Sequence, residues 1–68
     1  MAEELQAIAA RLITRLREAE KLASEGKISE AKVILKDVVK EARENGLDKS
    51  LRHLILRVKA LLRYKTQQ

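Results

Sequence analysis

Cysteine, proline, tryptophan and phenylalanine are all missing from this sequence, and Tyr64 is its only aromatic residue. The lack of cysteine excludes disulfides, thiolate nucleophiles and cysteine-ligated metals. No apolar run approaches the roughly 20 residues that a membrane-spanning helix needs. The chain starts with the acidic Glu3 and Glu4, whereas a secretory signal starts with basic residues. We therefore expect a soluble protein without signal peptide or transmembrane segment, and its localisation stays open.

Side chains that could perform catalysis are also scarce. An enzyme needs a nucleophile or an acid–base pair that other groups hold in a pocket, but His53 is the only histidine and no acidic residue lies within one helical turn of it in the sequence. Gly26 and Gly46 stand alone, so no glycine-rich phosphate loop is present. We expect no enzyme activity, no metal, no cofactor and no small-molecule substrate.

The two glycines divide the chain into three segments. Within each segment apolar residues recur every three or four positions, which is the period of one face of an α-helix. Glycine is the residue that most readily takes the left-handed conformation after a helix end. The pattern predicts helices at about residues 3–25, 30–45 and 49–65. The expected inner faces are Leu5, Ile8, Leu12, Leu16, Ala19 and Ala23; Ala31, Ile34, Leu35, Val38, Val39 and Ala42; and Leu51, Leu54, Ile55, Val58, Leu61 and Leu62.

Polar residues beside the glycines predict the helix ends. Ser29 and Asp48 carry side-chain oxygens and are expected to be the N-caps of the second and third helices. Leu47 follows Gly46 and is expected to fold back on Ala42, as in a Schellman closure. Loops this short make neighbouring helices antiparallel. Residues 1–68 should therefore form a single all-α domain, an antiparallel three-helix bundle with up-down-up topology.

Charge is distributed unevenly. The chain holds 15 Lys and Arg against 10 Asp and Glu, a net charge of +5, and residues 49–68 contain no acidic residue at all. The second helix carries its basic and acidic residues on opposite flanks of its apolar stripe. The basic flank is Lys32, Lys36, Lys40 and Arg43, and the acidic flank is Glu30, Asp37, Glu41 and Glu44. We interpret these flanks first as determinants of topology and solubility, and expect the acidic flank to lie near either Arg11 and Arg15 or the third helix.

Residues 16–45 resemble a tetratricopeptide-type helical hairpin, through the small and large residues around the turn at 25–31. Matching positions are Ala19, Leu22, Gly26, Ala31, Leu35 and Val38. Almost the whole chain resembles computationally designed three-helix miniproteins, because it combines short glycine loops, an aliphatic core and helix-favouring composition. That resemblance implies a thermostable scaffold, or a binder that presents one helical face to a target.

Two surfaces of the third helix could bind a partner. Its basic residues could follow a phosphate backbone, although we favour the interpretation that they only make the bundle soluble. The candidate phosphate contacts are Lys49, Arg52, Lys59 and Arg63. Apolar residues outside the main stripe, bracketed by Arg and Tyr, are typical of a protein interface. The candidate interface residues are Ile13, Arg17, Arg52, Leu56, Ala60 and Tyr64, although wider packing of the bundle could bury Ile13 and Leu56 instead.

The sequence thus favours a non-catalytic helical scaffold or protein-binding module that presents an exposed helix face to a protein target or to a second copy. The alternative is electrostatic, sequence-nonspecific binding of nucleic acid through the basic third helix. Binding to a membrane surface ranks third, because the bundle core already needs the apolar stripe of that helix.

Overall fold

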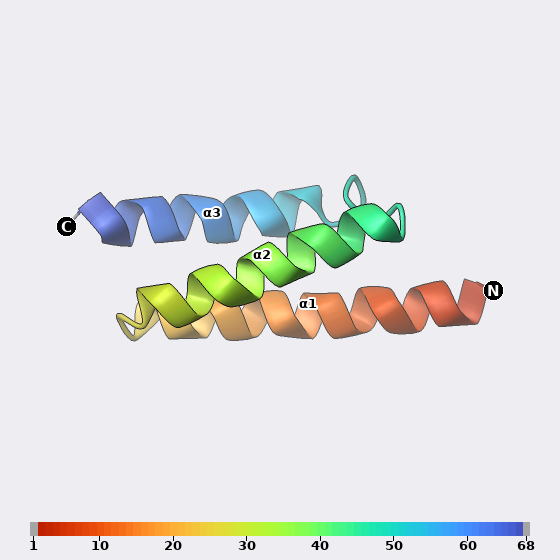
Figure 1. The fold of residues 1–68 in the computed structure, drawn as a ribbon, viewed down its shortest axis with the longest axis horizontal. Coiled ribbons are helices and arrows are strands. Elements are labelled where there is room, and N and C mark those ends of the chain that lie inside the picture. The colour runs from red at the N-terminus through yellow and green to blue at the C-terminus, as the bar shows by residue number, and fades with distance from the viewer. Residues whose placement is uncertain (1, 68) are drawn as a thin grey trace.

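The computed structural model describes the backbone of residues 2–67 and the side chains of residues 3–65. The chain forms three helices, α1 (Ala2–Ser24), α2 (Ile28–Glu44) and α3 (Arg52–Gln67), and no strand among the described residues. Figure 1 shows that α2 runs back diagonally along α1 and that α3 reverses direction again. The predicted up-down-up, three-helix bundle is confirmed.

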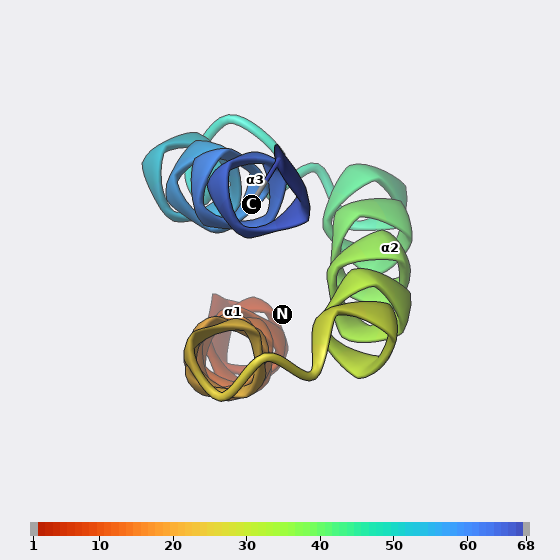
Figure 2. The ribbon, with the colours of Figure 1, turned by 90° about the vertical axis from the view of Figure 1, so that its left-hand side faces the viewer.

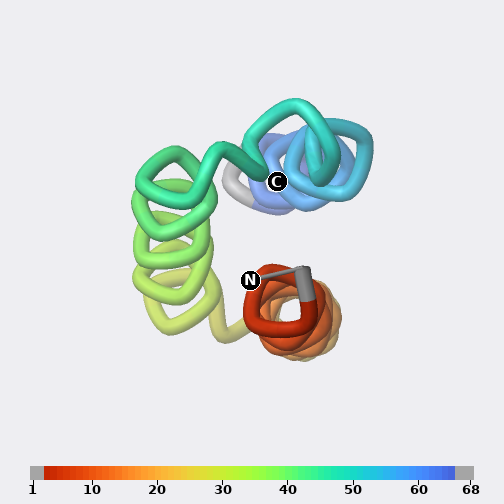
Figure 3. The backbone as a smooth tube through the Cα atoms, turned by 90° about the vertical axis from the view of Figure 1, so that its right-hand side faces the viewer, coloured from red at the N-terminus to blue at the C-terminus, as the bar shows by residue number. Residues whose placement is uncertain are grey.

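All three helices pack against one another, and α1 and α2 share the most extensive contact. Seen end-on, they surround a common interior, with α2 standing beside both α1 and α3 (Figures 2 and 3). The molecule measures 43 × 17 × 15 Å. It is elongated because the N-terminal turns of α1 and the C-terminal end of α3 extend past their neighbours at opposite ends (Figure 1).

Both helix–helix turns are Schellman closures. Gly26 and Gly46 have φ values of +84° and +68°, the left-handed conformation that their positions predicted. In the first turn the Lys27 amide donates to the Leu22 carbonyl at 2.8 Å. In the second the Leu47 amide donates to the Ala42 carbonyl at 2.7 Å, which confirms the expected fold-back of Leu47. The turns thereby supply donors to carbonyls in the last turn of α1 and of α2, and the Asn45 side-chain amide donates a further bond to the Glu41 carbonyl at 2.8 Å.

The two predicted N-caps are wrong. Helix α2 begins at Ile28, so Ser29 lies inside its first turn, and the N-cap residue Lys27 makes no side-chain capping bond. The Schellman closure already orients Lys27, whose carbonyl accepts the first helical bond from the Ala31 amide at 3.1 Å. Helix α3 begins at Arg52, three residues later than the predicted residue 49, because residues 48–51 form tight turns. Asp48 therefore lies outside α3 and cannot be its N-cap.

The core is entirely aliphatic. Leu12, Leu16, Val38 and Val58 are the largest fully buried side chains, and no polar side chain is buried in the described part of the chain. The buried residues among those described are Leu12, Leu16, Ala19, Ala23, Ala31, Ile34, Leu35, Val38, Ala42, Leu47, Leu51, Ile55, Val58 and Leu62. Burial of this apolar surface is the dominant stabilising contribution to the bundle.

One residue of the predicted first stripe is not in the core. Leu5 keeps 41% of its surface exposed, because the first turns of α1 extend past the neighbouring helices (Figure 1). Ile8, one turn further on, is half-buried and packs against the core.

Candidate binding groove between α2 and α3

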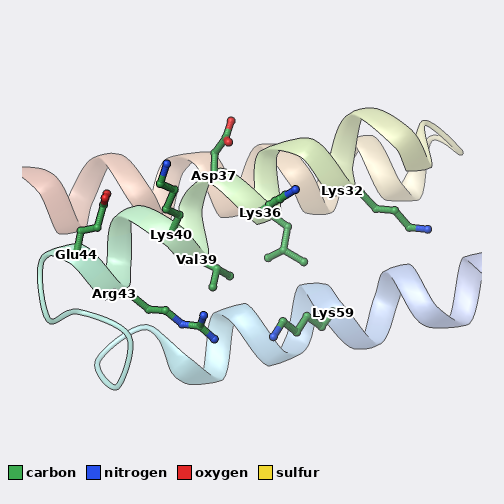
Figure 4. Close-up of a pocket in the computed structure, with 9 residues that line it drawn as sticks. Lys32, Lys36, Asp37, Val39, Lys40, Arg43, Glu44 and Lys59 are labelled. Carbon is green, nitrogen blue, oxygen red and sulfur yellow. The ribbon is translucent and has the colours of Figure 1, made fainter.

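An open groove of about 660 Å³ runs along α2, lined by eight α2 residues and by Lys59 of α3. Its floor includes the buried Leu35 and the half-buried Val39. In Figure 4, Val39 and Arg43 of α2 point toward α3, and Lys59 of α3 extends toward Arg43 from the other side. Lys32 to Arg43 is three turns of helix, so the α2 side of the groove is about 16 Å long.

A second hollow of about 300 Å³ continues this groove toward the α2–α3 turn. It shares Val39, Arg43 and Lys59 with the first hollow and adds Ile55 and Leu56 of α3 to the apolar lining. Leu56 is 48% exposed, so it offers apolar surface that the core does not use. We refer to the two hollows together as the α2–α3 groove.

The walls of the α2–α3 groove are strongly basic. Five cations line the first hollow and two more line the second: Lys32, Lys36, Lys40, Arg43 and Lys59, then Lys49 and Arg52. All seven side chains are exposed, and none of them takes part in an ion pair found among the described residues. The acids of the groove lining are Asp37, Glu44 and Asp48. In Figure 4 Asp37, Glu44 and Lys40 all point away from α3, whereas Arg43 of α2 and Lys59 of α3 extend toward each other, so the charge between these two helices is positive.

Two residues of the acidic flank of α2, Asp37 and Glu41, line a hollow beside α1. Glu41 accepts an ion-paired hydrogen bond from Arg11, and Asp37 and Arg15 line the same small hollow between these helices. Of the two expected neighbours, Arg11 and Arg15 are the ones that lie beside Glu41 and Asp37 of the acidic flank. Among the described residues, the ion pair to α3 comes from α1, where Glu20 Oε2 lies 3.4 Å from Arg57 Nε. These contacts leave Arg43 of the basic flank of α2 and Lys59 of α3 facing each other (Figure 4).

The structure separates the residues that the sequence grouped together. Of the candidate phosphate contacts, Lys49, Arg52 and Lys59 line the groove, whereas the exposed Arg63 lines neither of its hollows.

The candidate interface residues are distributed over two helices. Arg52 and Leu56 line the groove, while Ala60 and Tyr64 are exposed on α3 outside its lining. The half-buried Ile13 packs against the core, and Arg17 is exposed on α1.

Sequence reasoning did not identify the α2 side of the groove, which we call the α2 wall, as part of a site. Its cations are Lys32, Lys36, Lys40 and Arg43. The basic flank of α2 was interpreted as a determinant of topology and solubility, and Val39 as a core residue. The signal was nevertheless present, since the sequence carries basic residues on both sides of one short loop, from Lys32 to Arg43 and from Lys49 to Lys59. Recognising the site also required the knowledge that this flank, and not the acidic one, faces α3.

Neither a metal site nor a membrane span is found in the described part of the chain. No group of three or more potential ligands from His, Cys, Asp and Glu occurs there, and His53 is exposed in the first turn of α3. No helix combines the length and apolar character needed to cross a bilayer.

Comparison with protein-family models gives no match for this chain, and comparison with curated proteins gives none.

Proposed function

We propose that the chain is a non-catalytic helical scaffold that binds another protein through the α2–α3 groove. The observation that carries the proposal is the combination of an apolar floor, which includes Val39 and Leu56, with unneutralised cationic walls. Interface centres combine apolar residues with arginine, and rigid elements position such groups best. Two packed helices that share an aliphatic core form a suitable rigid support.

The regularity of the bundle supports the scaffold half of the proposal. Both turns use the same Schellman closure, and every buried side chain among the described residues is aliphatic. Local conformation and core packing therefore favour the same structure, as in idealised designed bundles. We propose a designed or idealised scaffold on this basis, and we expect it to be thermostable.

An unbiased selection tests the proposed function. Random 16-residue peptides displayed on phage are selected on the immobilised full-length chain, and each enriched peptide is then measured against two double variants. Val39→Thr with Leu56→Gln makes the groove floor polar. Val33→Thr with Leu5→Gln makes the same two exchanges at exposed positions outside the groove, where Val33 is 60% and Leu5 41% exposed. Circular dichroism confirms that both variants are folded.

We expect enriched peptides to bind the control variant as tightly as the parent chain and to bind the groove variant at least about tenfold more weakly, a loss of roughly 1.4 kcal/mol. Recovery of no binders, or of binders that respond equally to both variants, would contradict the proposal.

Nucleic-acid binding is the second candidate, because seven cations line one groove. Binding of a 20-base-pair duplex should then weaken steeply with salt, by about 10³-fold between 50 and 200 mM if six or more phosphates are contacted. Fluorescence anisotropy measures duplex binding at these two salt concentrations and so tests this candidate. An Arg52→Glu, Lys59→Glu variant is the charge-reversed control. Absence of binding at 50 mM salt eliminates this candidate.

A further inference from the structure

The secondary structure of the groove walls favours a helical partner over an extended one. An extended peptide gains affinity chiefly by pairing its backbone with an exposed strand edge, and the described part of the chain contains no strand. Its groove walls are helices, whose backbone groups already bond to each other and which present only side chains. A helix satisfies its own backbone and needs only an apolar stripe to cover the floor at Val39 and Leu56.

The charges of the groove then determine the residues beside that stripe. On the α2 wall Lys32, Lys36, Lys40 and Arg43 follow one another at intervals of four, four and three residues, which is one cation per helical turn. The α3 wall adds Arg52 and Lys59. A docked helix would therefore meet a net positive charge, since seven cations and three acids (Asp37, Glu44 and Asp48) line the groove. Acidic flanks are attracted there, whereas lysine flanks meet like charge.

A polyphosphate would use this groove less completely. Phosphates could contact the cations, but Val39 and Leu56 would remain without an apolar partner. The only aromatic residue that could stack on a base, Tyr64, does not line either hollow, and single-stranded binders rely on such stacking.

Resting on the proposed function, we infer that the α2–α3 groove binds an amphipathic helix of about three turns whose apolar stripe carries Glu or Asp on both sides. Such a helix lies along α2 and α3 as a fourth helix of the bundle and neutralises the two basic walls.

Three synthetic 15-residue peptides test this inference. They share one leucine stripe at helical spacing and differ only in the flanking residues, which are all Glu, all Gln or all Lys. Binding to the full-length chain is measured by anisotropy at 50 and 200 mM salt, and amide chemical shifts locate the contact. We expect the Glu peptide to bind about tenfold more tightly than the Gln peptide at low salt, the Lys peptide to bind most weakly, and the shifts to follow Leu35, Val39 and Leu56.

Two double variants make the charge argument specific. Lys36→Gln with Lys59→Gln removes two groove cations, and Lys21→Gln with Lys65→Gln removes two cations that line neither hollow of the groove. The first variant should lose most of the preference for Glu over Gln, and the second should keep it. Lys36→Glu with Lys59→Glu should shift the preference toward the Lys peptide.

The outcomes separate the inference from the proposed function. Equal binding of the Glu and Gln peptides, with shifts in the groove, overturns the acidic partner and leaves the protein-binding groove intact. If none of the three peptides shifts groove amides, the inference is overturned, and the unbiased peptide selection decides the proposed function independently. A duplex that displaces the Glu peptide from the groove and binds more tightly at 200 mM salt also overturns it.

Discussion

The turn at Gly46 sets α3 against α2 and so determines whether the groove exists. Gly46 has φ = +68°, and a methyl group added there would meet no atom within 4 Å beyond its chain neighbours. Replacement by L-alanine therefore causes no steric clash with the rest of the fold. Its cost is the left-handed backbone conformation, roughly 1–2 kcal/mol for an L-residue. Reduced freedom of the unfolded chain offsets about 0.4–1 kcal/mol of this.

We therefore expect Gly46→Ala to destabilise the bundle by about 1 kcal/mol. D-alanine at the same position prefers positive φ and restricts the unfolded chain equally. It should stabilise the protein by about 0.4–1 kcal/mol, so the two epimers should differ by roughly 1–2 kcal/mol. In a domain of this size 1 kcal/mol corresponds to about 4–8 °C in Tm.

The assay compares chemically synthesised chains by guanidinium and thermal unfolding, followed by circular dichroism. The control places L- and D-alanine at the exposed position Lys40, inside α2. In a right-handed helix the order must reverse, and the L-epimer must be the more stable. Equal stability of the two Gly46 epimers, with the reversed order intact at Lys40, would refute the assignment of the turn to the glycine conformation.

Two further predictions concern the core and the α1–α2 charges. Leu16 is 1% exposed and Leu5 is 41% exposed, so Leu16→Ala should destabilise the bundle by about 2–5 kcal/mol and Leu5→Ala by less than about 1 kcal/mol. Denaturant unfolding measures both, and similar losses at the two positions would contradict the observed overhang of α1. The Arg11–Glu41 ion pair is surface-exposed, so a double-mutant cycle with alanine should give a coupling of about 0.2–1 kcal/mol that shrinks in 1 M salt. A salt-independent coupling would indicate that the contact is not electrostatic.

Helix C-terminal ends were predictable from the local sequence, whereas helix starts were not. Gly26 and Gly46 were predicted as helix-ending residues because the left-handed conformation is a property of the residue itself. The N-caps at Ser29 and Asp48 were wrong because a helix start also depends on what precedes it. Because of the Schellman closure at Lys27, α2 begins before Ser29. Because residues 48–51 form turns, α3 begins several residues after Asp48.

Exposure was harder to predict than helix formation. Leu5 belongs to the same predicted apolar stripe as Leu12. Leu12 is buried and Leu5 is exposed, because α1 extends past its neighbours at that end. Periodicity identifies a face but carries no information about how far the neighbouring helices extend.

By itself, the sequence determined three amphipathic helices, two left-handed turns and an α2 with one basic and one acidic flank, because each of these depends on residues only a few positions apart. Only the tertiary structure decided which flank faces which helix. An up-down-up bundle can place its third helix on either side of the first pair, and the opposite hand would turn the acidic flank of α2 toward α3. In the observed arrangement Arg11 of α1 forms an ion pair with Glu41. On the other side of α2, Arg43 of the basic flank faces Lys59 across the groove. The candidate site is therefore a consequence of the hand of the bundle, which no local pattern contains.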